Sequence, residues 1–246
     1  MDVISRHAQL SALIHDGLTT DLARLSPLPS DDAISRRAVE RLRALVDAAP
    51  AFLLLLAEPW LKDESEDLLP TLLDCARVHL YARILDDALD ESLLPHRIHL
   101  LRYQPIFWQT VAGLAVRFPH LQVQCTHLIG ETVMAVEADD AGRAPRYWGR
   151  KNHHLLLLPL LLSGDDARYH HHRETLSTLI SLSQACDEWW QGELCPAVTE
   201  AVLDIYPSWM EPERLLSLHR DGWCSASARI IREGQYLLEQ IALQKT

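Results

Sequence analysis

Apolar residues recur at helical spacing along almost the whole chain, and no segment alternates polar and apolar residues as an amphipathic strand does. Only 9 of the 246 residues are glycine, so glycine-rich turns of the kind that join short strands are scarce. Hydrophobic residues make up 48% of the chain, enough to bury a large core. These features predict an all-α fold in a single domain over residues 1–246, with helices at 3–25, 32–49, 51–61, 65–92, 97–117, 120–139, 145–163, 171–194 and 211–243.

Charge and cysteine content narrow the classes of function. The formal net charge is -11 and no basic run occurs, so we expect no nucleic-acid partner. The longest apolar runs, 51–57 and 155–162, are too short to span a bilayer, and the first residues lack the apolar core of a signal peptide. The cysteines are odd in number and form no CxxC pair, which predicts reduced thiols in a cytoplasmic protein: Cys75, Cys125, Cys186, Cys195 and Cys224.

Three aspartates, Asp86, Asp87 and Asp90, lie close together in the segment RILDDALDES. No turn signal precedes them, so the motif is expected in the middle of a helix. Asp86 and Asp90 then share a face, because residues four apart are neighbours on a helix. Mg²⁺ would relieve their mutual repulsion, since it binds carboxylate oxygens together with substrate phosphate. The alternative is an ordinary solvated acidic face.

A second polar cluster lies in the segment SLSQACDEWWQGEL. Its amide and carboxylate side chains form one helical face, which indicates either a metal-facing stripe beside a cavity or a partly exposed polar surface. Between the two clusters, Arg150 and Lys151 begin a long apolar helix. Lys151 is a candidate to hold a phosphate, the alternative being a terminal charge whose stem lies along apolar surface. The residues of the second cluster are Gln184, Asp187, Glu188 and Gln191.

In this order, the segments resemble the trans-isoprenyl diphosphate synthases and the class I terpene synthases. ARVHLYARILDDALD looks like the helix with that family's first aspartate-rich motif. YWGRKNHHLLLLPLLLSG is similar to the segment holding its diphosphate-binding lysine, here Lys151. LIGETVMAVEAD occupies the place of the family's helix with a Gly-Gln pair, and Glu131 stands here where Gln is usual. QACDEWWQ resembles the family's second aspartate-rich motif, with Glu188 and Gln191 replacing two aspartates. The resemblance covers about residues 40–194 and implies a helical bundle around a central apolar cavity.

The chain departs from the chain-elongating members of that family in the part that binds isopentenyl diphosphate. Those enzymes carry an early Gly-Lys-Arg stretch, whereas VERLRALVDAAP keeps only Arg41 and Arg43 as candidates. They also carry paired arginines after the first motif, whereas Arg97 and Arg102 are separated here. This pattern is similar to the small divergent prenyltransferases that make moenomycin-type chains, and to cyclases of the same fold.

The resemblance implies that Mg²⁺ ions bridge an allylic prenyl diphosphate to the two acidic helices, and that pyrophosphate leaves to give an allylic cation. The implied catalytic residues are Asp86, Asp87, Asp90 and Lys151. The implied metal ligands are Asp86, Asp87, Asp90, Asp187, Glu188 and Gln191, and the implied diphosphate ligands are Lys151, Arg97, Arg150 and Gln184. The implied tail pocket contains His79, Tyr81 and Ala82, and a tyrosine floor favours a C10–C15 tail.

Three hypotheses follow from these patterns. The first is an Mg²⁺-dependent enzyme that ionises a prenyl diphosphate and transfers the prenyl cation to an acceptor. The second is a terpene cyclase in which the cation attacks its own double bonds, although CDEWWQGEL does not match the N-D-x-x-S-x-x-x-E motif of many cyclases. The third is a non-catalytic helical interaction protein with chance acidic patches. The resembling synthases are commonly homodimers, so dimerisation is also to be tested.

Overall fold

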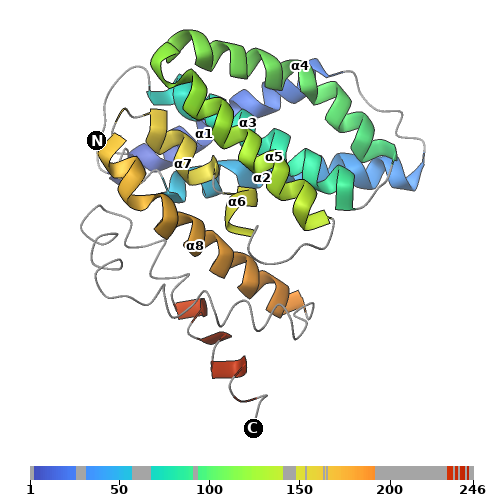
Figure 1. Cartoon of the computed structure of the whole chain (residues 1–246). Helices are drawn as coiled ribbons and strands as arrows, with labels where there is room; N and C mark the ends of the chain where they lie inside the picture. Colours follow the sequence, from blue (N-terminus) through green and yellow to red (C-terminus); the bar gives the residue numbers. More distant parts are fainter. Residues whose placement is uncertain are drawn as a thin grey trace.

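A computed structural model describes residues 3–25, 32–56, 68–90, 94–140, 148–152, 154–162, 164, 166–191 and parts of 232–243. These residues form helices, with no strand among them, so the predicted all-α bundle is confirmed. No helix in these ranges is both long and apolar enough to cross a membrane. Figure 1 shows α1 (Val3–Arg24), α2 (Ala33–Leu56), α3 (Leu68–Asp90), α4 (Leu94–Arg117), the 3-10 helix η2 (Pro119–Leu121), α5 (Gln122–Asp140), α6 (Trp148–Asn152), α7 (His154–Leu162) and α8 (Asp166–Gln191).

Some helix boundaries differ from the prediction. The helix α2 continues through Pro50, where two separate helices were predicted. Pro50 has no N–H to donate to the carbonyl of Val46, but it is buried, and tertiary packing outweighs the local preference. Within the range predicted as one helix, 145–163, the structure describes α6 and α7, and residue 153 between them lies outside the described residues. The helix predicted at 211–243 is described only between 232 and 243.

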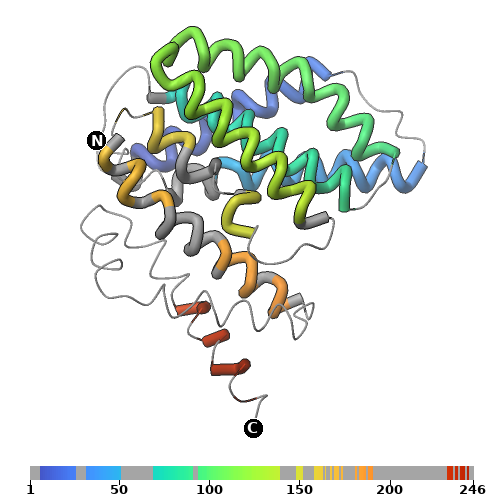
Figure 2. The backbone as a smooth tube through the Cα atoms, viewed as in Figure 1, coloured from blue at the N-terminus to red at the C-terminus, as the bar shows by residue number. Residues whose placement is uncertain are grey.

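The helix α3 is the centre of the bundle. It packs against α1, α2, α4, α5 and α7, and Figure 2 shows its tube running among theirs. Buried residues therefore occur all round α3, and not along one stripe as on a surface helix. Leu72, Val78, Leu80 and Ala88, which project to four different sides of α3, are each 3% exposed or less. A carboxylate at a buried position of α3 therefore contacts neighbouring helices.

A smaller apolar cluster joins α6 to α8 and to the described residues near the C-terminus. It contains Trp148 of α6, Ala185 and Cys186 of α8, and Leu237 and Ile241. The helix α6 also packs against α5 and α7, so it connects α8 with the main bundle. In Figure 1, α8 runs below the bundle on the side where α6 lies.

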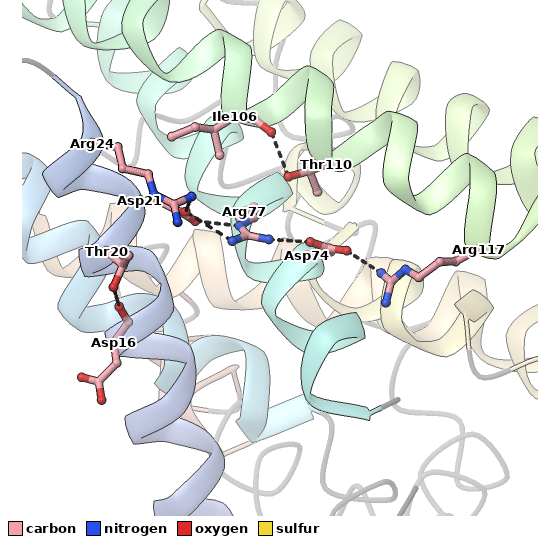
Figure 3. A network of polar contacts seen from close by, with 9 residues as sticks. All are labelled: Asp16, Thr20, Asp21, Arg24, Asp74, Arg77, Ile106, Thr110 and Arg117. Atoms are coloured by element: carbon pink, nitrogen blue, oxygen red, sulfur yellow. Dashed lines mark hydrogen bonds and ion pairs between the residues drawn. The ribbon is translucent and has the colours of Figure 1, made fainter. Parts of the chain in front are cut away.

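A chain of ion pairs ties α1, α3 and α4 together (Figure 3). Arg77 of α3 lies at its centre, with Nε 2.6 Å from Oδ2 of Asp21 and Nη1 2.8 Å from Oδ1 of Asp74. Arg117 of α4 contacts the other oxygen of Asp74. Asp21 is only 2% exposed, and its further neighbour Arg24 is 3.6 Å away with a largely exposed side chain. Asp21 therefore depends mainly on Arg77 for its compensating charge.

We predict that Arg77→Met lowers the free energy of unfolding by about 3 kcal/mol, because it leaves the buried Asp21 carboxylate without its main partner. Urea denaturation followed by circular dichroism measures this change. Arg24→Met is the matched control on the same carboxylate, and its exposed pair should contribute less than about 1 kcal/mol. Equal losses in the two variants would contradict the assignment of Arg77 as the central cation.

Candidate functional site

The structure brings Lys151 of α6 into contact with Asp86 of α3. The distance from Lys151 Nζ to Asp86 Oδ1 is 2.7 Å, and the two side chains are only 7% and 5% exposed. Arg83, one helical turn before Asp86, places Nη1 2.7 Å from the other carboxylate oxygen, Oδ2. Each oxygen of Asp86 therefore has a cation within hydrogen-bond distance.

Asp87 is bound by a different helix. Arg41 of α2 donates two hydrogen bonds to its carboxylate, from Nε to Oδ2 at 2.9 Å and from Nη2 to Oδ1 at 3.0 Å. Consecutive residues on a helix project about 100° apart, which is why Asp86 reaches α6 while Asp87 reaches α2. The sequence offered Arg41 only as a candidate for an acceptor diphosphate, and its pairing with Asp87 was not foreseen.

Asp90 is the last residue of α3, and it is exposed. The three aspartates are helical, as predicted, but they lie in the final residues of α3 and not in the middle of a helix. The C-terminus of a helix carries partial negative charge, which disfavours carboxylates. Burying Asp86 and Asp87 there requires cations from elsewhere, and Arg41 and Lys151 come from two other helices.

The second predicted cluster is described in part. On α8, Gln184 donates from Nε2 to Oε1 of Glu188 at 2.7 Å, and both side chains are partly buried. The side chains of Asp187 and Gln191, which are on the same helix, lie outside the described residues. Through the cluster around Trp148, α8 packs against the short helix that carries Lys151. Lys151 thus belongs to an element in contact with one acidic helix and forms an ion pair with the other.

Two of the predicted diphosphate ligands are exposed on the surface. Arg97 on α4 and Arg150 on α6 are exposed, and neither is among the cations that contact Asp86 or Asp87 in the described part of the chain. Glu131, which stands where the resembling family has Gln, instead accepts a hydrogen bond from Arg173 of α8 at 2.7 Å.

The residues predicted to line a pocket for the isoprenoid tail do not share one side of α3. The ring of Tyr81 stacks on Phe107 of α4, with centroids 3.8 Å apart and planes 13° from parallel. His79 and Ala82 are buried, and helical spacing places them on the same side of α3 as Asp86. Burial, with a further contribution from Arg83, lowers the pKa of His79 to about 3, so this histidine is a neutral, core-like residue. The role of these residues in a tail pocket stays a prediction.

A small pocket opens beside Asp87, where α2, α3 and α4 meet. His96 and His99 of α4 line it together with Asp87, and the centroids of the two rings, which meet edge to face, are 6.4 Å apart. The cavity volume is about 10 Å³, which suits about one water molecule and is far too small for an isoprenoid tail. These histidines were not predicted as site residues, although they follow the aspartates closely at i, i+3 spacing. The apolar remainder of the lining is Ala38, Leu42, Leu45 and Ile84.

The donor atoms suit Mg²⁺ in chemistry, because Asp86 and Asp90 offer carboxylate oxygens four residues apart on a helix. Within the described ranges, however, no three His, Cys, Asp or Glu side chains are grouped closely enough to hold a metal ion. Both oxygens of Asp86 are already in contact with cations. A metal could reach Asp86 only after Lys151 or Arg83 moves.

Comparisons of the chain with known protein families, with curated proteins and with solved structures gave no match.

We predict a pH dependence of stability from His99. Burial, with His96 and Arg102 adding repulsion, lowers the pKa of His99 to about 4 from its ordinary value of 6.5. As the pH falls between these values, the unfolded chain takes up a proton that the folded chain does not, so folding becomes less favourable. His99→Gln should reduce the slope of unfolding free energy against pH by about 1.4 kcal/mol per pH unit in this window.

Urea denaturation at a series of pH values measures that slope. His120→Gln, at an exposed histidine, is the control. The same slope in wild type and His99→Gln would show that His99 does not titrate in this way.

Proposed function

We propose that this chain is an Mg²⁺-dependent class I isoprenoid synthase, which ionises an allylic prenyl diphosphate of C10–C15 length and transfers the prenyl cation to an acceptor. The observation that carries the proposal is the buried contact of Lys151 with Asp86, 2.7 Å long. It joins the residue expected to bind diphosphate to the motif expected to bind metal, from separate helices. A solvated acidic face, the alternative interpretation of the motif, would leave Asp86 and Asp87 exposed, and they are buried.

The local charges support the same chemistry. Three cations, Arg41, Arg83 and Lys151, converge on two carboxylates at the end of α3. When Mg²⁺ is bound to the substrate, it neutralises the diphosphate and makes it a better leaving group. Lys151 would then place its ammonium against the departing oxygens, where it stabilises the negative charge that develops. The surrounding apolar helices would exclude water from the allylic cation.

A competing candidate is a non-catalytic helical protein, and one observation favours it specifically. The carboxylates are already neutralised within the chain, and the pocket beside Asp87 has room for about one water molecule. Such a protein would keep the ion pairs of Asp86 and Asp87 when Mg²⁺ and a prenyl diphosphate are present. The proposed enzyme must open them when its substrate arrives.

We predict that the protein releases pyrophosphate from geranyl or farnesyl diphosphate in the presence of Mg²⁺. Coupling that requires an added acceptor such as isopentenyl diphosphate indicates a prenyltransferase, whereas a hydrocarbon or alcohol formed without one indicates a cyclase. Asp86→Asn should lower the rate by about 100-fold or more, because it weakens the metal ligand. Asp16→Asn, at an exposed aspartate of α1, should leave the rate unchanged.

Direct binding assays complete this experiment. If neither diphosphate is turned over and neither binds with Mg²⁺, the proposal fails and the non-catalytic candidate stands. Binding without turnover would keep the proposal and indicate that the acceptor is still missing.

We also propose that the protein functions in the cytoplasm as a homodimer. Among the cysteines that the structure describes, Cys75 and Cys125 are free, as in a reducing compartment. On α4, Leu94, Leu101 and Trp108 recur every seven residues and are 69%, 65% and 59% exposed. Exposed apolar stripes of this kind mark protein–protein contacts.

Charge favours pairing this stripe with α5 of a second copy. The α4 sequence contains arginines and no acidic residue, whereas α5 contains the exposed residues Glu137 and Met134. A twofold axis would bring α4 of each chain onto α5 of the other, so that opposite charges meet twice.

Light scattering coupled to size-exclusion chromatography tests the dimer. We predict a mass of about 56 kDa, twice the 27.9 kDa of one chain. Leu101→Ser combined with Trp108→Ser should shift the protein to the monomer. Ile34→Ser, which alters an exposed apolar residue of α2, should leave the dimer intact. A monomeric wild type would contradict this part of the proposal.

A further inference from the structure

At the end of α3 the buried carboxylates and cations are paired with one another, so neither a metal ion nor an anion finds an uncompensated charge. Asp86 has Lys151 on one oxygen and Arg83 on the other, and Asp87 has Arg41 on both. A divalent cation alone would approach a carboxylate whose oxygens are taken, beside three positive charges. A diphosphate alone would approach cations that are held by carboxylates.

The two ligands together remove both obstacles. The metal can replace a basic side chain on Asp86, and the released side chain can bind the phosphate oxygens. Every charge then has a partner again, in a site where unpaired charges are costly.

We propose that Lys151 occupies the metal position on Asp86 in the ligand-free protein and transfers to the diphosphate when metal and diphosphate bind together. This inference rests on the proposed function. Lys151 is thus both the competitor that keeps metal alone out and the ligand that receives the anion.

The geometry identifies Lys151, and not the arginines, as the side chain that moves. Arg83 is on the same helix as Asp86, at i−3, so it stays beside the carboxylate whatever the neighbouring helices do. Arg41 holds Asp87 through a two-hydrogen-bond fork, which is the strongest type of contact in the cluster. Lys151 reaches Asp86 with a compact ammonium on a flexible four-carbon stem, from the five-residue helix α6.

Arg83 follows from this as a positioning residue. It keeps one oxygen of Asp86 fixed while the other exchanges Lys151 for metal. Arg83 was not predicted from the sequence, because a lone arginine one turn before an aspartate motif does not by itself indicate a function.

Mn²⁺ binding followed by electron paramagnetic resonance tests the exchange without any turnover. For wild type we expect weak Mn²⁺ binding alone and at least about tenfold tighter binding with pyrophosphate, with pyrophosphate affinity raised equally by Mn²⁺. Lys151→Gln should tighten Mn²⁺ binding alone by about tenfold, because it removes the competing charge. It should also weaken pyrophosphate binding in the presence of Mn²⁺. Lys151→Arg keeps the charge and should bind Mn²⁺ alone as weakly as wild type.

The outcomes separate this inference from the proposed function. If wild type binds Mn²⁺ and pyrophosphate together but Lys151→Gln does not tighten Mn²⁺ binding alone, the exchange is wrong and the proposed function survives. If wild type binds neither, alone or together, both fail. If Lys151→Gln does not fold, as judged by circular dichroism, the wild-type titrations decide: independent binding of Mn²⁺ and pyrophosphate overturns the exchange, and tenfold coupling supports it.

Discussion

The cost of burying negative charge at the C-terminal end of α3 is the constraint on which the candidate site depends. Removing a carboxylate from water costs several kcal/mol, and the helix terminus adds to that cost. Asp86 and Asp87 are tolerated because cations lie within 3.0 Å of them. Because Arg41 comes from α2 and Lys151 from α6, these ion pairs also hold α2 and α6 against α3. Buried ion pairs rarely stabilise a protein more than apolar side chains of similar size would, so stability alone does not account for this cluster.

The same central helix carries a second charged cluster, and the comparison is informative. Towards its N-terminal half, Arg77 joins Asp21 and Asp74 in a chain that links α1 to α4. These ion pairs tie helices together, and none of their residues is a predicted site residue. The cluster at Asp86 is different, because one of its cations is a lysine on a short helix that also packs against the second acidic helix. A structural brace and a candidate site therefore share one element.

The all-α class and most helix positions could be predicted, because helical periodicity is a local property of the sequence. The helix through Pro50 could not, since its persistence depends on tertiary packing. Along the chain, Lys151 lies between the two acidic segments, and in the structure it contacts Asp86 of the first. The partners Arg41 and Arg83, and the histidines beside Asp87, became visible only when side-chain directions were known.

A crystal structure of the protein with Mg²⁺ and pyrophosphate would show directly whether a metal ion replaces Lys151 on Asp86. We predict a metal ion about 2.1 Å from a carboxylate oxygen of Asp86, with Lys151 Nζ moved from that carboxylate to the pyrophosphate. Arg83 should remain beside Asp86. An unchanged ion pair between Lys151 and Asp86, with no metal or pyrophosphate near α3 at saturating concentrations, would contradict the account and identify the cluster as purely structural.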